Sequence, residues 1–302
     1  MPFYAYIALG SPFLLLALVI LVRTLAFRPK KKAKTNITPI TVDEKRATTE
    51  LSSMIRCRTV SDADPAREDT AEFEKFEKLL PTLYPNVFAT CERIDIKERV
   101  ILLRWRGKSE REPTVLMSHY DVVSVEEGSW SHAPFDGVVE GDILYGRGTL
   151  DTKVTLAAAL HAAETLLNDH FVPSHDVYFA FSGNEEIAGG GAPAIVSYFE
   201  KSGITLGAVF DEGGAVVENV FPGVKVPAAM VGIAEKGMMN LEFAVEASGG
   251  HASAPPPITP IGRLSRACCR VESDPFPMQL SEPAALMFNT LPRYSKIGRA
   301  HV

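Results

Sequence analysis

Short apolar runs alternate with helix-forming segments along the middle of the chain, and this pattern constrains the fold most. Runs rich in β-branched and aromatic residues at 114–118, 176–181 and 206–210 predict buried strands. Residues 153–168 and 192–201 predict helices. Strands that alternate with helices favour a largely parallel sheet covered by helices on both faces. We therefore predict an α/β fold.

Polar side chains follow each predicted strand, and a glycine-rich turn at 145–151 delivers another carboxylate to the start of a helix. In α/β sheets, ligands bind beyond the carboxyl ends of the strands, so these residues are the candidates for a site. They comprise His119 and Asp121 after the first run, Asp151 after the turn, Glu185 and Glu186 after the second run, and Asp211 and Glu212 after the third.

Carboxylates gathered at one sheet edge repel one another unless cations hold them together. One histidine among several acidic residues suits zinc, manganese or cobalt. Each residue alone has a structural explanation: Asp151 can cap a helix, Glu185 and Glu186 can belong to a solvated loop, and Asp211 can form a turn. Those explanations do not account for the shared position at one edge, so the joint pattern favours a metal site.

Six motifs in one order resemble the zinc metallopeptidase family of aminoacylases, carboxypeptidase S and secreted N-acyl-amino-acid hydrolases. The carboxypeptidase S branch is the most similar, and the resemblance covers about residues 41–292. The motifs are Ser118-His119-x-Asp121-Val-Val, residues 130–135, Tyr145-Gly-Arg-Gly-x-x-Asp151, Glu185-Glu186, Asp211-Glu-Gly-Gly and Gly249-Gly-His251-Ala-Ser-Ala-Pro.

The resemblance implies a centre with two zinc ions, for which Co²⁺ or Mn²⁺ could substitute. His119 and Asp211 would bind one ion, Glu186 would bind the second, and Asp151 would bridge the two. Aminoacylase-like relatives use the glutamate of the Asp-Glu-Gly turn, so Glu212 is the alternative to Asp211.

The resemblance also implies three catalytic roles. Asp121 would orient His119, Glu185 would be the general base that takes a proton from the bridging water, and His251 would stabilise the oxyanion from a smaller lid domain. The implied reaction is hydrolysis of an amide or peptide bond next to a free carboxylate, in a peptide or an N-acyl amino acid.

We predict five segments. They are a transmembrane anchor at 1–28, a basic linker at 29–40, the first part of the catalytic domain at 41–232, a partial α+β lid or dimerisation domain at 233–296, and a non-native tail at 297–302. Alternating apolar and polar residues at 239–247 predict a strand in the lid. Residues 260–272 predict a helix that belongs to the core of the lid or to the interface of a homodimer.

Residues 4–22 are uncharged and mostly apolar, a length that suits a single membrane span; a cleaved signal peptide is the alternative. The basic residues at 23–34 place the protein on the cytoplasmic side by the positive-inside rule, whereas the resemblance places it in a vacuole or the secretory lumen. The chain has a net charge of −6 and its sequence indicates no broad basic surface, so we exclude nucleic acid as a partner.

Three features depart from the family pattern. Thr152 and Asn184 stand where relatives usually have acidic residues. The family completes its second zinc site with a histidine beyond the lid, and the chain ends inside the predicted lid, so we expect a truncated sequence. The alternative to a truncated hydrolase is an inactive short isoform that acts as a membrane-anchored binding partner.

Overall fold

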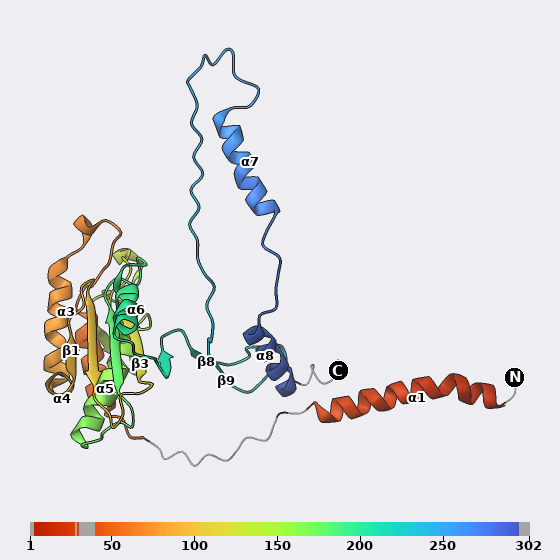
Figure 1. Cartoon of the computed structure of the whole chain (residues 1–302), viewed down its shortest axis with the longest axis horizontal. Coiled ribbons are helices and arrows are strands. Elements are labelled where there is room, and N and C mark those ends of the chain that lie inside the picture. The colour runs from red at the N-terminus through yellow and green to blue at the C-terminus, as the bar shows by residue number, and fades with distance from the viewer. Residues whose placement is uncertain (1–2, 28, 30–39, 296–302) are drawn as a thin grey trace. The chain divides into compact units, whose positions relative to one another are not determined.

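The computed structural model describes residues 3–27, 29 and 40–295, and the chain divides into two units (Figure 1). The α/β unit is Asn36–Glu212, and the second unit combines Met1–Thr35 with Gly213–Val302. The predicted linker falls almost wholly, and the predicted tail at 297–302 wholly, outside the described residues. The predicted domain bounds at 41, 232 and 296 stay predictions.

A five-stranded sheet in the order β1-β2-β6-β3-β7 forms the centre of the α/β unit. Strand β3 (Thr114–His119) is parallel to β6 (Val177–Ser182) and to β7 (Ala208–Phe210). Strand β2 (Val100–Trp105) is antiparallel to β6 and to β1 (Glu92–Ile94). All strands except β2 therefore run in one direction. The three predicted strands and the α/β fold are confirmed, in a sheet that is mixed rather than wholly parallel.

Helices cover both faces of the sheet, as predicted. On one face, α2 (Glu44–Ile55), α3 (Thr70–Leu83), α4 (Pro85–Thr90) and α5 (Lys153–Asn168) share a core with alternate residues of β2, including Ile101 and Leu103. On the other face, α6 (Gly191–Lys201) packs through Ile195 and Phe199 against Leu102 and its neighbours. Side chains of a strand point alternately to its two faces, so the apolar runs of β2 and β6 are buried on both sides.

Three further short elements belong to this unit, one of which is a 3-10 turn at Glu127–Ser129. Strands β4 (Val138–Glu140) and β5 (Ile143–Tyr145) form a hairpin that leads directly into the glycine-rich turn before α5. A 3-10 turn at Pro65–Arg67 leads into Glu68, which lies close to the sheet edge where β3 ends.

Glu68 and Arg99 form a largely buried ion pair. Arg99 Nη2 donates to Glu68 Oε2 over 2.5 Å, and the exposed fractions of the two side chains are 27% and 4%. The Arg99 guanidinium also lies 4.2 Å from the centroid of the Phe73 ring. This hydrogen bond from Arg99 is the main cause that lowers the pKa of Glu68 below its ordinary value of 4.5.

Replacing this carboxylate in Glu68→Gln is expected to lower the free energy of unfolding by about 1–2 kcal/mol at pH 7, because a charge-assisted hydrogen bond is lost and Arg99 is partly exposed. Because the pKa of Glu68 is lower in the folded than in the unfolded protein, its ionised carboxylate stabilises the fold at pH values above the unfolded pKa. This stabilisation is lost as the pH falls through the folded pKa. The difference between parent and variant should therefore shrink below about pH 4.5.

Urea unfolding followed by tryptophan fluorescence measures this effect, because both tryptophans, Trp105 and Trp130, lie in the α/β unit. Glu74→Gln is the matched control, since Glu74 pairs with Lys78 at 63% exposure on α3. Equal midpoints for the two variants at pH 7, or a difference that grows in acid, would contradict the assignment.

The second unit contains α1 (Phe3–Ala26), an antiparallel pair of β8 (Ala215–Val217) and β9 (Ala228–Met230), α7 (Pro260–Ser273) and α8 (Glu282–Thr290), followed by a 3-10 turn at Leu291–Tyr294. Helix α7 confirms the helix predicted at 260–272. The strand predicted at 239–247 is wrong, because among the described residues no segment pairs with these residues, and most of their side chains are exposed.

The predicted membrane anchor finds no support in the structure. In the described part of the chain, no helix combines the length and the apolarity needed to cross a membrane. The side of the membrane and the homodimer stay predictions.

Candidate metal centre

Three predicted residues from three elements meet at the carboxyl edge of the sheet. His119 is the last residue of β3, Asp151 lies shortly before α5, and Glu212 follows β7. His119 Nε2 lies 2.9 Å from Asp151 Oδ1 and 3.3 Å from Glu212 Oε1. The candidate ligand atoms all lie within 4.8 Å of one another. One imidazole and two carboxylates at this spacing fit a zinc-like cation.

The surroundings of His119 favour a positive charge at this point. Burial lowers the pKa of His119, but the hydrogen bond to Asp121 and the charges of Glu212 and Glu185 outweigh that effect and raise the pKa to about 10. Either a proton on the imidazole or a divalent cation bound to it would supply that positive charge. The electrostatics therefore agree with the donor set.

Asp121 lies beneath the site and is fully buried. Its carboxylate accepts hydrogen bonds from Ser61 Oγ at 2.7 Å and from the backbone N–H groups of Glu185 and Glu186 at 3.1 Å each. His119 Nδ1 lies 3.0 Å from the Asp121 carbonyl oxygen and 3.4 Å from Oδ1. Burial would raise the pKa of Asp121, but the hydrogen bonds from His119, Ser61 and Glu185 lower it below its ordinary value.

Glu185 extends from this anchored backbone toward the imidazole. Its Oε2 lies 3.7 Å from His119 Nε2, and its side chain is 53% exposed. Burial is the main cause that raises its pKa; His119 opposes the rise, and the charges of Glu212, Asp121 and Asp151 add to it. A carboxylate with a raised pKa beside a metal centre can accept and return a proton.

The other predicted ligands are placed differently. Asp211 is exposed, and its Oδ1 accepts a hydrogen bond from the backbone N–H of Glu212, so the structure brings the alternative, Glu212, to His119. The pKa of Glu186 is raised by burial first and then by Asp151, but its carboxylate is not part of the described cluster. His251 lies in the second unit, and its role stays a prediction.

The turn that carries Asp151 needs glycine at two positions. Gly148 has a φ of +87°, and a Cβ there would meet Val122 Cγ1 at 2.8 Å. A Cβ at Gly146 would clash with Ile55 Cγ2, at the end of α2. The glycines thus let the turn pack directly against α2 and the segment after β3.

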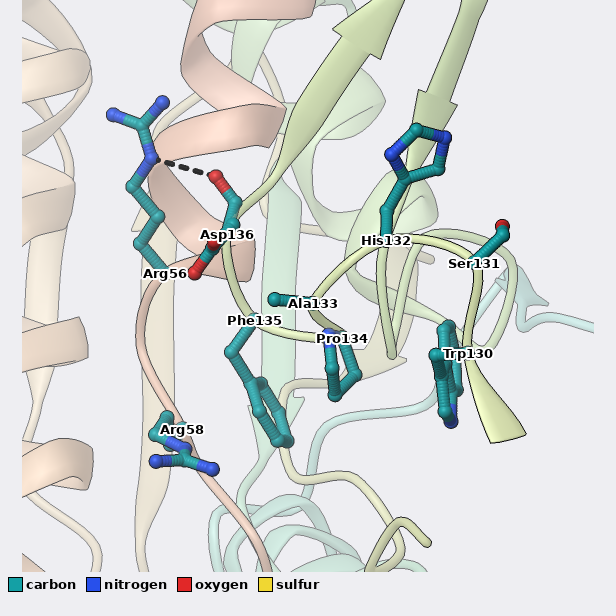
Figure 2. Close-up of a pocket in the computed structure, with 9 residues that line it drawn as sticks. All are labelled: Arg56, Arg58, Trp130, Ser131, His132, Ala133, Pro134, Phe135 and Asp136. Atoms are coloured by element: carbon teal, nitrogen blue, oxygen red, sulfur yellow. Dashed lines mark hydrogen bonds between the residues drawn. The ribbon is translucent and has the colours of Figure 1, made fainter. Parts of the chain in front are cut away.

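A pocket of about 750 Å³ lies beside this turn and contains none of the candidate ligands. Figure 2 shows Arg56 and Arg58 on one side of it and Trp130 and His132 on the other. Arg56 Nε donates to the Asp136 carbonyl at 3.0 Å. The backbone N–H of Arg147 donates to the Pro134 carbonyl, so the pocket loop supports the turn. The sequence does not indicate this pocket, because residues 56–58 and 130–136 meet only in the fold.

The model of peptidase family M20/M25/M40 matches residues 115–299. N-fatty-acyl-amino acid synthase/hydrolase PM20D1 of Homo sapiens is 35% identical over 231 residues, which are 76% of this chain and 46% of that protein. Probable carboxypeptidase S-like 2 of Dictyostelium discoideum is 31% identical over 282 residues, which are 89% of this chain and 54% of that protein.

Among solved structures, the M20 family metallo-carboxypeptidase Sso-CP2 of Sulfolobus solfataricus is 23% identical with a TM-score of 0.46, over 58% of this chain and 38% of that one. The chain spans about half the length of the curated relatives it matches. The family match covers more than half of the chain and includes His119, Asp151, Glu185 and Glu212. This chain belongs to peptidase family M20/M25/M40, a family of metallopeptidases and amidohydrolases.

Proposed function

We propose that this chain carries the hydrolytic centre of an enzyme that cleaves an amide or peptide bond next to a free carboxylate. The observation that carries the proposal is the imidazole of His119 with three carboxylates around one nitrogen: Asp151 at 2.9 Å, Glu212 at 3.3 Å and Glu185 at 3.7 Å from Nε2. Nε2 therefore faces a group of potential metal ligands and a potential base.

His119, Asp151 and Glu212 would hold a zinc ion, and Glu186 with Asp151 would contribute to a second. Bound zinc lowers the pKa of a water molecule and polarises the carbonyl of the scissile bond. Glu185 takes a proton from the attacking water and passes it to the leaving amine. The Asp121 carboxylate contacts both His119 Nδ1 and the backbone N–H of Glu185, so it fixes the position of the base relative to the imidazole.

The relatives indicate the class of substrate. Their names describe an N-fatty-acyl-amino acid synthase/hydrolase and a probable carboxypeptidase. Both activities involve an amide bond whose amine side ends in a carboxylate. We therefore propose a peptide or an N-acyl amino acid with a free carboxylate as the substrate.

Metal binding and hydrolysis test this proposal directly. The purified chain should bind Zn²⁺ or Co²⁺, and His119→Ala should weaken that binding at least about 100-fold, because losing a ligand costs no less than losing a residue that supports one. Binding is measured by titration with Co²⁺ and by elemental analysis. Hydrolysis is measured with an N-fatty-acyl amino acid and an N-blocked dipeptide, each compared with its methyl ester.

His175→Ala is the control, because His175 is exposed and contacts the Arg111 carbonyl away from the acidic cluster. A chain that takes up no metal would contradict the proposed centre. If the chain retains metal, and neither it nor the full-length protein that we expect cleaves either substrate, the hydrolytic role would be contradicted and an inactive, ligand-binding form supported.

A further inference from the structure

Lys153 is a lysine with no exposed surface at the first position of α5, two residues after Asp151. Its Nζ donates to the Cys57 carbonyl at 2.8 Å and to the Met54 carbonyl at 3.2 Å. The same atom lies 5.2 Å from the centroid of the Phe76 ring on α3. One side chain therefore joins the start of α5 to the end of α2.

The carbonyl acceptors explain how a lysine can be buried here. Helix α2 ends at Ile55; the Met54 carbonyl in its last turn and the Cys57 carbonyl just after it each accept a backbone N–H, and each keeps a second lone pair for Lys153. Burying an amine without hydrogen bonds costs several kcal/mol, whereas the end of a helix supplies both acceptors and a favourable dipole. An apolar side chain of similar length would fill the same volume without that requirement. Packing alone therefore does not explain a lysine at this position.

Hydrogen bonds of the backbone connect Lys153 to the turn that contains Asp151. The Lys153 N–H donates to the Gly148 carbonyl at 3.0 Å and closes the turn that contains Asp151. Ser118 Oγ, from β3, donates to the Thr152 carbonyl at 3.1 Å. The side chain of Asp151 is itself 69% exposed, so its position depends on this backbone more than on packing around the carboxylate.

We propose that Lys153 is a positioning residue that fixes Asp151 against His119 by tying the first residue of α5 to the end of α2. This inference rests on the proposed function, in which Asp151 is a metal ligand. The lysine does not contact the metal or the substrate; it sets the backbone from which the carboxylate reaches Nε2. Misplacing a carboxylate by a fraction of an ångström weakens a metal site, because ligand distances are narrowly defined.

The test compares Lys153→Met with Lys75→Met in the full 302-residue chain. Methionine keeps most of the length and removes the donors. Lys75 is a close control, because its Nζ donates to the Arg56 carbonyl at 2.9 Å, also at the end of α2, but from α3 and at 51% exposure. Each variant is titrated with Co²⁺, and the visible absorption spectrum reports the geometry of the ligands.

We expect Lys153→Met to bind Co²⁺ about 10–100-fold more weakly, with a changed spectrum, and Lys75→Met to match the parent. In an Asp151→Ala background, Lys153→Met should have little further effect on Co²⁺ affinity, because the ligand it positions is already gone. A lysine that only stabilises the fold would lower the urea midpoint and leave the affinity and spectrum of the folded protein unchanged.

Lys153→Leu, which also removes the donors but has a smaller side chain, replaces Lys153→Met if the latter does not fold. Parent-like affinity and spectrum in the folded variant would overturn the inference while the proposed function stands. A parent chain that binds no Co²⁺ would overturn both. Equal weakening in the presence and absence of Asp151 would also overturn the inference, because the lysine would then act through another ligand.

Discussion

Glu185→Gln is expected to lower the rate of amide hydrolysis by about 10²–10⁴-fold and to leave Co²⁺ affinity within a few-fold of the parent. Glutamine keeps the size of the side chain and its hydrogen-bonding capacity but cannot take a proton at neutral pH. Glu185 Oε2 lies 3.7 Å from His119 Nε2, so its carboxylate would lie beside a cation held by His119, where it could take a proton from a water that the cation activates. The loss should therefore appear in kcat, with KM changed little.

Glu186→Gln provides the comparison, because the two glutamates are adjacent and both donate backbone N–H groups to Asp121. As a ligand of the second ion, Glu186 should affect the number of metal ions bound, whereas Glu185 should not. Steady-state kinetics and elemental analysis on both variants separate base from ligand. If Glu185→Gln turns over substrate within a few-fold of the parent, Glu185 is not the general base. If that variant binds fewer metal ions than the parent, Glu185 is a metal ligand.

The position of the site could be predicted because strand ends are visible in the sequence. The apolar runs that became β3, β6 and β7 each end in the residues that reach the site, and the parallel arrangement brings those ends to one edge. The choice between Asp211 and Glu212 could not be made in this way. Successive residues of an extended segment point in opposite directions, and the sequence does not show which direction faces His119.

Two supporting residues carried no local signal. Ser61 reaches Asp121 across 60 positions, and Lys153 reaches Met54 across 99. A single serine or lysine has no spacing that indicates such a contact. The packing of α5 against α2 creates the contact of Lys153, and the pairing of the segment after α2 with Val122 creates that of Ser61. Strand β2 was not predicted, and its direction would not have followed from the sequence either, because an apolar run looks the same in a parallel and an antiparallel strand.

The residues at 239–247 show the converse failure. Apolar and polar residues alternate here, as is typical of a strand. Such a segment forms a strand only when another segment pairs with it, and no described segment does so. The pattern of β3 and β6 was reliable because each strand is paired on both sides within the α/β unit. For strands, periodicity therefore predicted those of the α/β unit and failed at 239–247, where no described segment supplies a partner.

Asp121→Asn is expected to lower the free energy of unfolding of the α/β unit by about 3–5 kcal/mol, the range for breaking a buried charged pair. An asparagine would place an NH₂ group against one of the N–H donors of Glu185 or Glu186, and that buried donor would lose its acceptor. Urea unfolding followed by tryptophan fluorescence measures the change. Asp142→Asn, at an exposed position of the hairpin between β4 and β5, is the control.

The same variant distinguishes a structural from an orienting role for Asp121. If the carboxylate orients His119, Asp121→Asn should bind Co²⁺ about 10–100-fold more weakly at urea concentrations far below its midpoint, where the protein is folded. His119 Nδ1 lies closer to the Asp121 carbonyl oxygen, at 3.0 Å, than to its carboxylate, at 3.4 Å. Parent-like Co²⁺ affinity in the folded variant would therefore assign the orientation of the imidazole to the backbone, and leave the carboxylate as the anchor of the glutamate loop alone.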